Sequence, residues 1–278
     1  MAIFKGGTEL SELYVGANAV KEVYKGSDLI WSGDVQRSDH FWNDTIGFWT
    51  HDRFNPPQLV PNWNNQKLNP PSLDLTVING NNSNNLSGVQ LAGYWGTRLG
   101  KTNNQAAAAY GAVLKSTSSL FPLGASNFTI EFWTYQYTVI TNPVGDVVSI
   151  LYDASNNGNN VAGLWGMNCT ASQGFAKVGG QTCSSQTNSI QTGQWQHHAI
   201  CRVGTTVTYY VDGVAGSNTA SVSGNMGGSF LPCLGALGKP TDRTYSCNAV
   251  FRQVRLTKAA RYTSNFTPFK YFYPSEPI

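Results

Sequence analysis

Few residues in this chain have the types and spacing that catalysis requires. Hydrolysis of a glycosidic bond with retention needs two carboxylates about 5–5.5 Å apart. The glutamates of the chain are Glu9, Glu12, Glu22, Glu131 and Glu276. Glu131 is the one that lies within a strand-like apolar stretch of the main domain, and it has no acidic partner nearby in the sequence. We therefore predict that Glu131 is a structural carboxylate and that the protein is not an enzyme.

Two adjacent histidines, His197 and His198, are the next candidates for chemistry. Adjacent side chains of a strand point to opposite faces, so these two rings cannot jointly bind one metal ion. We expect His197 to pack on one face of its sheet and His198 to lie on the other. The sequence also lacks the Gly-x-Ser-x-Gly elbow of an esterase.

Hard oxygen ligands follow one apolar run of the chain. Asp153 precedes a stretch rich in asparagine that includes Asn156 and Asn159. Carboxylate and amide oxygens of this kind bind calcium, although the same residue types also dominate ordinary turns. We take Asp153, Asn156 and Asn159 as a candidate calcium site, with a solvated turn as the alternative, and expect no other cofactor.

Aromatic residues with polar neighbours are the candidates for sugar binding, because sugars present apolar ring faces and hydroxyl edges. The candidate residues are Trp63 with Asn64, Tyr94 with Trp95, and Trp165. Trp133 and Trp195 lie in strand-like patterns, and we expect both in the core.

Composition excludes several classes of partner. Charged residues make up 12% of the chain, the net charge is +3, and no cluster of Lys and Arg occurs, which argues against nucleic-acid binding. No stretch approaches the roughly 18 apolar residues of a membrane span. The N-terminus lacks the pattern of a signal peptide. We expect a protein that is made in a cytoplasm, is not exported by that route, and does not insert into a membrane.

Alternating apolar residues predict strands in the second half of the chain. Residues 128–133 and 207–211 show the period of two that is typical of strands with one face on a core. Gly204 joins two strand-like runs, and the Asp-Gly step at 212–213 is typical of a tight hairpin. Many short strands separated by turns favour a two-sheet sandwich.

The cysteines leave two alternatives open. Cys201 lies within an apolar strand pattern and is predicted to be a buried thiol. Cys169 and Cys183, like Cys233 and Cys247, flank a predicted hairpin, so a cross-strand disulfide is geometrically possible in each case. Reduced thiols are the alternative that a cytoplasmic location favours.

The first 33 residues contain a ten-residue repeat. Residues 11–20 align with residues 21–30, and residues 4–10 form a half copy. The period predicts short strands separated by glycine turns, in a small β-meander. A unit this short buries little apolar surface alone. We therefore assign residues 1–33 to an attachment or oligomerisation module and residues 34–278 to the main domain.

Four stretches resemble the laminin-G-like (concanavalin A-like) jelly roll: residues 127–133, 195–199, 211–213 and 254–268. The resemblance spans roughly residues 38–270 and implies an all-β fold, a two-sheet antiparallel jelly-roll sandwich. That fold hosts lectins, glycosidases, adhesion modules and phage proteins, so the fold alone does not fix the function. The wording of residues 257–268 and of the N-terminal repeat is similar to that of bacteriophage structural proteins.

This second resemblance implies a bacteriophage virion protein, such as a tail fibre or a tail-associated adhesin. It would contact the host surface, through glycan, without catalysis. The alternatives are a capsid decoration protein with no ligand and a tail polysaccharide depolymerase. Residues 1–33 would bind other virion proteins, and a homo-oligomer, a trimer in a fibre, is expected.

Overall fold

The computed structural model describes residues 41–49, 91–92, 94–100, 123–137, 173–224 and 248–268, and the backbone of further short strands outside these ranges. The chain forms two compact units. One comprises Met1–Trp42 with Tyr273–Ile278, and the other comprises Asn43–Phe272. No helix in the described part of the chain has the length and hydropathy needed to cross a bilayer.

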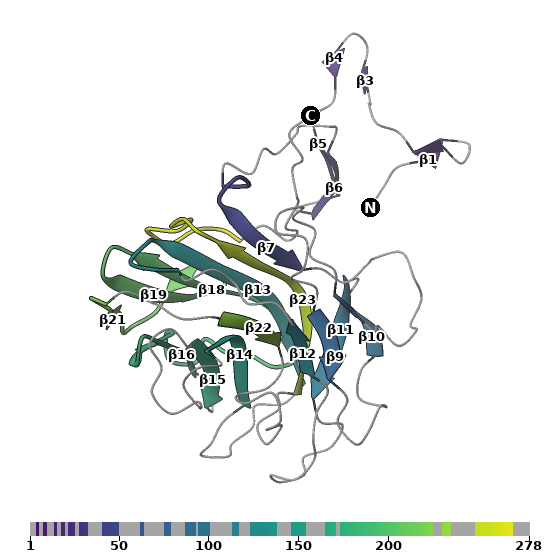
Figure 1. Ribbon diagram of the computed structural model, residues 1–278. Coiled ribbons are helices and arrows are strands. Elements are labelled where there is room, and N and C mark those ends of the chain that lie inside the picture. The colour runs from purple at the N-terminus through teal and green to yellow at the C-terminus, as the bar shows by residue number, and fades with distance from the viewer. Residues whose placement is uncertain are drawn as a thin grey trace. The chain divides into compact units, whose positions relative to one another are not determined.

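Three antiparallel hairpins follow the ten-residue repeat of the first unit (Figure 1). Their strands are β1 (Phe4–Lys5) with β2 (Thr8–Glu9), β3 (Tyr14–Val15) with β4 (Asn18–Ala19), and β5 (Glu22–Lys25) with β6 (Asp28–Ser32). Each hairpin is a separate two-stranded sheet, so the described pairings do not join the copies into one meander. The predicted boundary at residue 33 stays a prediction.

Two antiparallel sheets make up the second unit. The larger has nine strands in the order β10-β11-β23-β13-β18-β19-β20, with β7 paired to β23 and β21 paired to β19. Its strands are β7 (Thr45–Trp49), β10 (Ser87–Leu91), β11 (Tyr94–Gly100), β13 (Phe128–Gln136), β18 (Trp195–Val203), β19 (Thr206–Val211), β20 (Val214–Ala215), β21 (Ala220–Ser221) and β23 (Asn248–Thr257).

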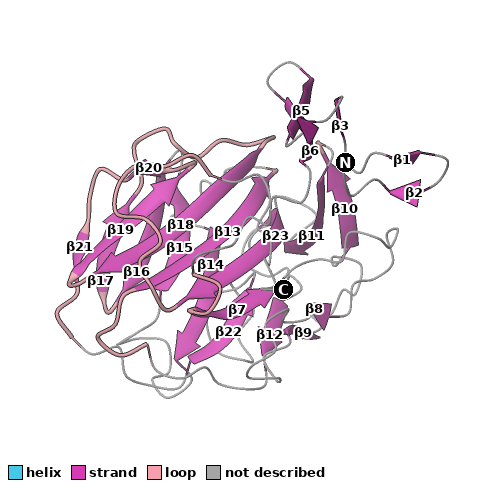
Figure 2. Ribbon diagram, turned by 90° about the horizontal axis from the view of Figure 1, so that it is seen from above, coloured by secondary structure: helices cyan, strands magenta, loops and turns pink. Residues whose placement is uncertain are grey.

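The smaller sheet has eight strands in the order β17-β16-β15-β14-β22-β12-β9-β8. Its strands are β8 (Asn62–Trp63), β9 (Leu75–Ile78), β12 (Val113–Ser116), β14 (Asp146–Asp153), β15 (Trp165–Thr170), β16 (Gln173–Val178), β17 (Gln181–Ser184) and β22 (Phe230–Leu234). Strands β14 to β16 lie below β13, β18 and β19 in Figure 1 and overlap them when seen from above in Figure 2. The predicted all-β, antiparallel jelly-roll sandwich is thus confirmed.

The core lies between the two sheets. Phe128, Ile130 and Phe132 alternate along β13 and are fully buried, as the period of two predicts. On the facing sheet, a side chain at Gly174 would meet the ring of Tyr209 at 2.6 Å. Glycine is therefore what allows β16 to approach β19 this closely.

Two turns in the larger sheet have the backbone conformations that the sequence predicts. Gly204 joins β18 to β19 with a φ of +60°. Asp212 and Gly213 join β19 to β20 with φ values of +49° and +78°, the two positive values that a type I′ hairpin requires. The Asp-Gly hairpin prediction is confirmed.

One of the two possible disulfides is excluded. Cys183 is a free, buried thiol on β17, whereas Cys169 lies on β15. Strand β16 separates them by two strand spacings, so their backbones are at least about 9–10 Å apart, beyond the roughly 7 Å that a disulfide can span. The prediction of a single hairpin between these cysteines is wrong, because three strands and not two lie between residues 165 and 184. Cys247 lies outside the described residues, so the Cys233–Cys247 bond stays a prediction.

Candidate functional site

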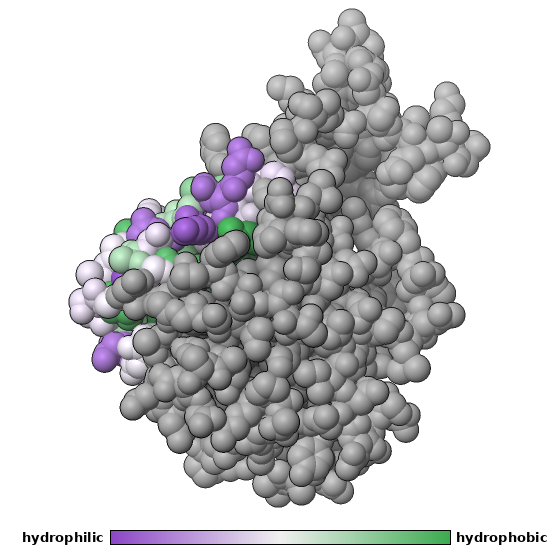
Figure 3. All heavy atoms as spheres, in the orientation of Figure 1, coloured by the Kyte–Doolittle hydropathy of each residue, from purple (hydrophilic) through white to green (hydrophobic). Residues whose placement is uncertain are grey.

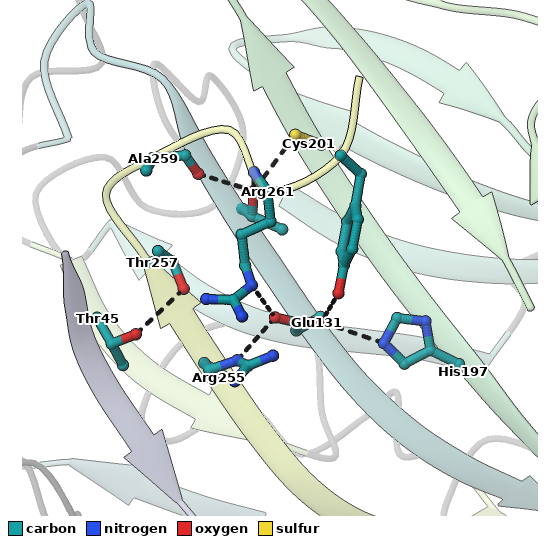
Figure 4. Close-up of polar contacts among 10 residues, drawn as sticks. Thr45, Glu131, His197, Cys201, Arg255, Thr257, Ala259 and Arg261 are labelled. Carbon is teal, nitrogen blue, oxygen red and sulfur yellow. Dashed lines mark hydrogen bonds and ion pairs between the residues drawn. The ribbon is translucent and has the colours of Figure 1, made fainter. Parts of the chain in front are cut away.

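The larger sheet has one face on the core and a second face, here called the outer face. Alternation along β13 places Thr129, Glu131, Trp133 and Tyr135 on the outer face. Residues 258–268, here called the tail segment, follow β23 and cross this face (Figure 4). Tyr262 and Phe266 of the tail segment pack on Ala199, Cys201 and Tyr210.

Glu131 is the polar centre of the outer face and is fully buried. Its Oε1 accepts hydrogen bonds from Arg255 Nε at 2.7 Å and pairs with Arg261 Nε at 3.0 Å. Its Oε2 accepts a hydrogen bond from the Tyr262 hydroxyl at 2.6 Å and lies 3.2 Å from His197 Nε2. Figure 4 shows His197 of β18, Arg255 of β23 and Arg261 of the tail segment pointing toward this carboxylate of β13.

The surroundings of Glu131 fix its charge. Burial alone raises the pKa of a carboxyl group, but Arg255, His197 and Arg261 together hold the pKa of Glu131 well below its usual range. Burial and the charge of Glu131 raise the pKa of Tyr262 above its usual range. Both groups therefore keep one protonation state near neutral pH. Glu131 is bonded to β18, β23 and the tail segment, and the prediction that it has no catalytic role stays a prediction.

The two adjacent histidines lie on opposite faces of the sheet, as predicted. His197 meets Glu131 on the outer face. His198 lies in the core, where its ring nitrogens are 2.8 Å from the Tyr209 hydroxyl and 2.9 Å from Thr134 Oγ1. Burial, with a smaller contribution from His197, lowers the pKa of His198 to about 3. Among the described residues, no group of three or more His, Cys, Asp or Glu is placed to hold a metal ion.

The described thiols are poor nucleophiles. Cys201 is buried, as predicted, with its sulfur 3.3 Å from Thr129 Oγ1. Burial raises the pKa of Cys201, and it raises the pKa of Cys183 to about 12. The thiolate is the reactive form, and neither side chain forms it readily near neutral pH.

A second group of side chains occupies the other end of the outer face. It consists of Tyr94, Trp133, Tyr135, Trp195 and Arg252, and is here called the aromatic cluster. The guanidinium carbon of Arg252 lies 4.2 Å, 5.2 Å and 5.3 Å from the ring centroids of Tyr94, Trp133 and Trp195. Cations at such distances from ring faces are attracted by the ring quadrupole.

Trp195 connects strands across this cluster. Its ring packs edge-on against Tyr135 at 5.7 Å and Tyr94 at 6.4 Å, and its Nε1 donates to Leu91 O at 2.9 Å. A side chain at Gly96 would meet the Trp195 ring at 2.9 Å, so glycine makes room for it on β11. Trp133 is buried and Trp195 is half-buried, and both lie on the outer face and not between the sheets. The prediction that both lie in the core is therefore confirmed only for the burial of Trp133.

The structure brings one of the predicted ligand residues, Tyr94, into this cluster. The backbones of Trp63, Trp95 and Trp165 lie in β8, β11 and β15, and their side chains are outside the described residues, as is Asn64. Asp153 ends β14 opposite Phe230. Asn156 and Asn159 lie outside the described residues, so the calcium site stays a prediction.

Sequence reasoning missed Tyr135, Trp195 and Arg252 as members of one cluster. Tyr135 lies opposite Trp195, and Trp133 lies opposite Arg252, on paired strands. The sequence pattern does not show which strands pair, so it could not predict these contacts. The described surface on the side of β19 and β21 is mixed in hydropathy, with hydrophilic and hydrophobic residues interspersed (Figure 3).

Comparison with known proteins assigns the fold to a family. The sequence profile of the concanavalin A-like lectin/glucanases superfamily matches residues 103–264. A search of curated proteins gives no match. Similar solved structures include the receptor binding domain of botulinum neurotoxin D, with 11% identity, a TM-score of 0.46, and coverage of 80% of this chain and 51% of that one.

Another is domain 4 of AbnA, a GH43 extracellular arabinanase from Geobacillus stearothermophilus, in complex with arabinotriose. It shows 11% identity, a TM-score of 0.49, and coverage of 78% of this chain and 93% of that one. This chain spans about half the length of the matched chain of the botulinum neurotoxin D structure. The profile match covers more than half of the sequence, and the chain belongs to the concanavalin A-like lectin/glucanases superfamily.

Proposed function

We propose that this protein is a bacteriophage virion structural protein, a tail fibre or tail-associated adhesin. Its sandwich domain binds glycan of the host surface without catalysis. The observation that supports a function without catalysis is the buried, ionised carboxylate of Glu131. Two arginines, a histidine and a tyrosine surround this buried carboxylate and hold it ionised.

A glycosidase requires a carboxyl group that can take up and release a proton beside a second acid. Glu131 cannot take up a proton near neutral pH, and its neighbours are cations and a tyrosine hydroxyl. Within a superfamily of lectins and glucanases, this favours the lectin type of function.

The virion part rests on both ends of the described chain. The sequences of the three hairpins of residues 1–33 and of the tail segment resemble those of phage structural proteins. Two-stranded hairpins this short need a further surface on which to pack. We assign that surface to other virion proteins or to further copies of the chain, with a trimer as the expected assembly. Many weak sites on one particle would then act together.

Two measurements test this function. Antibody labelling of intact particles, viewed by electron microscopy, should place the protein on the tail. A chain lacking residues 1–33 should no longer join the particle, whereas the full chain should. Labelling over the capsid lattice would favour a decoration protein, and particles that incorporate the shortened chain would contradict the attachment role.

The full chain should also bind purified host surface polysaccharide without releasing reducing ends. Release of reducing ends by the wild-type chain would support a depolymerase and contradict the proposed function. Absence of binding to host cells and to their polysaccharide would contradict the adhesin role.

A further inference from the structure

A loop rich in amide and hydroxyl side chains leads into β18. It comprises residues 186–194, here called the polar loop, and none of its residues is charged. Its exposed side chains are those of Gln186, Thr187, Asn188, Gln191, Thr192 and Gln194. Amide groups both donate and accept hydrogen bonds, as the hydroxyl groups of a sugar do. A neutral ligand with several hydroxyl groups therefore fits this surface better than an ionic ligand does.

Buried groups hold the polar loop in one conformation. Gln196 is 3% exposed, and its Oε1 accepts from Gln191 N at 2.7 Å while its Nε2 donates to Ser189 O at 2.7 Å. Gly193 N donates to Gln136 O at 2.9 Å, which joins the loop to β13. A loop that is already ordered loses little conformational entropy when a ligand binds. The polar loop is therefore prepared to present its side chains in fixed positions.

Two exposed amides of the polar loop form a pair. Gln194 Nε2 donates to Gln191 Oε1 at 2.7 Å, so the two groups lie side by side at the surface. Each amide group has two N–H donors and two acceptor lone pairs. The bond between them uses one donor of Gln194 and one lone pair of Gln191, and the pair keeps donors and acceptors for neighbouring hydroxyl groups of a ligand.

Half-buried aromatic rings lie beside the polar loop. The Tyr135 ring packs edge-on against Trp195 at 5.7 Å and against Tyr137 at 5.6 Å. All three residues are half-buried and so retain exposed surface. A side chain at Gly193 would lie 4.0 Å from the Tyr135 hydroxyl, and Trp195 directly follows Gln194 in the chain. Sugars have apolar faces that pack on aromatic rings, so the rings and the paired amides complement two sides of one sugar.

We propose, resting on the glycan-binding function above, that the polar loop and the adjoining rings of Tyr135 and Trp195 form the site for a neutral sugar of the host glycan. The apolar face of the sugar packs on the exposed parts of the two rings. Its hydroxyl groups bond to the paired amides of Gln191 and Gln194. All four side chains reach the surface, so a sugar within a long polysaccharide contacts them without entering a cavity. Binding involves no covalent step.

The test uses the full chain and a panel of defined probes. The neutral probes are tetrasaccharides of glucose, galactose, mannose and N-acetylglucosamine, and tetragalacturonate is the acidic probe. Saturation-transfer difference NMR and calorimetry should show binding of at least one neutral probe and weaker binding of tetragalacturonate. The affinity for the neutral probe should stay within about twofold between roughly 0.05 and 0.5 M NaCl, because salt screens charges and this ligand has none.

Two variants place the site. Gln194→Ala removes one amide of the pair and should weaken binding of the neutral probe about three- to tenfold. Tyr135→Ala removes a ring and should weaken it about tenfold. Gln181→Ala is the matched control, because it removes an exposed amide at the start of β17, outside the polar loop, and should leave the affinity within about twofold. Thermal unfolding identifies a variant that fails to fold, and Gln194→Ala then carries the test if Tyr135→Ala does so.

The outcomes separate this inference from the function on which it rests. The neutral-sugar site would be overturned if no neutral probe bound, if tetragalacturonate bound as tightly as the best neutral probe, or if both variants kept full affinity. An affinity for the neutral probe that falls severalfold with salt would also overturn it. Host polysaccharide would still bind the wild-type chain in each of those cases if the adhesin role holds. Absence of that polysaccharide binding would contradict the adhesin role as well.

Discussion

The hydroxyl of Tyr262 lies 2.6 Å from Glu131 Oε2, and the two residues are 131 positions apart in the sequence. The contact fastens the tail segment to the middle of β13. Two further bonds act nearby: Thr129 Oγ1 donates to Ala259 O at 2.8 Å, and Phe266 N donates to Gly213 O at 3.0 Å. The tail segment is therefore held at the centre of the sheet and at the hairpin that ends it.

Tyr262→Phe should lower the free energy of unfolding by about 1.5–3 kcal/mol, the range for a hydrogen bond to a charged group. Urea unfolding checks the value. A double-mutant cycle that combines Tyr262→Phe with Glu131→Gln measures the interaction energy of this pair, because the stability effects of residues in one hydrogen-bond network do not simply add. If the stability loss of the double variant equals the sum of the losses of the two single variants, the two residues are not coupled.

Glu131→Gln keeps the size of the side chain and removes its charge. Arg255 and Arg261 would then face a neutral amide in a buried position. Removing one partner of a buried ion pair costs about 3–5 kcal/mol, so we expect a loss of that size in urea unfolding. A loss below about 1 kcal/mol, the range of a surface ion pair, would contradict the central role of this carboxylate.

Local signals predicted the parts of this structure that depend on neighbouring residues. The Asp-Gly step at 212–213 requires positive φ at two positions wherever it occurs, so the hairpin could be read directly. The alternation in residues 128–133 predicted the strand and the face that packs between the sheets for the same reason, although the tail segment buries the other face as well. The Cys169–Cys183 hairpin could not be read in this way, because an additional strand fits between the two cysteines.

The outer face depends on a bulge that no local signal revealed. In a regular strand, residues three apart point to opposite faces, so Arg252 and Arg255 would be separated. Gln253 has a φ of +50°, and the register between β13 and β23 shifts at this point. The extra residue returns both arginines to the outer face, opposite Trp133 and Glu131. Sequence periodicity alone would have placed one of them in the core.

His198 predicts a loss of stability at mildly acidic pH. Its pKa is lowered from 6.5 to about 3 in the folded protein, so the unfolded chain binds a proton that the folded chain does not. The contribution of His198 is complete above pH 6.5 and is lost as the pH falls toward 3. Between pH 6 and 5 the loss should approach about 1.4 kcal/mol per pH unit.

Urea unfolding of the wild type and of His198→Gln at several pH values measures this contribution. Glutamine can still bond to Tyr209 and Thr134 but does not titrate. The variant should show a shallower decline than the wild type from pH 6.5 to 5. Parallel declines would assign the titration to another group.

Two glycines form a matched pair for the hairpin and the tail segment. Both Gly204 and Gly213 have positive φ, and a side chain at Gly204 would meet open space. A side chain at Gly213 would overlap the carbonyl group of Phe266. Gly204→Ala should therefore cost about 1–2 kcal/mol from backbone strain alone. Gly213→Ala should cost more and displace the tail segment.

Hydrogen exchange of the Phe266 amide checks the displacement, since that amide bonds to Gly213 O. Its protection should fall in Gly213→Ala and persist in Gly204→Ala, and urea unfolding ranks the two variants. Equal costs with full protection of Phe266 in both would show that the tail segment does not depend on this glycine.

The contacts of Arg202 predict that guanidinium ion can restore stability to a variant that lacks this side chain. It is 1% exposed, and its guanidinium donates to the carbonyl oxygens of Gly204, Gly124, Val222 and Gly224 at 2.8–3.2 Å. These acceptors come from separate turns at one end of the sandwich, so the side chain joins them. Arg202→Ala removes the donor shared by these four carbonyl groups, of which the Val222 bond is buried, and leaves a cavity where the buried side chain was, so it should cost about 3 kcal/mol or more.

Guanidinium ion at millimolar concentration should raise the unfolding temperature of Arg202→Ala, because it can occupy the vacated position and bond the same oxygens. The wild type is the control, since its position is filled by its own side chain and the same additive should not stabilise it. Arg202→Lys should lose less stability than Arg202→Ala and gain little from the additive, because an ammonium group supplies some of the donors. A parallel response of the wild type and Arg202→Ala would show that the four carbonyl groups do not form a single cation-binding position.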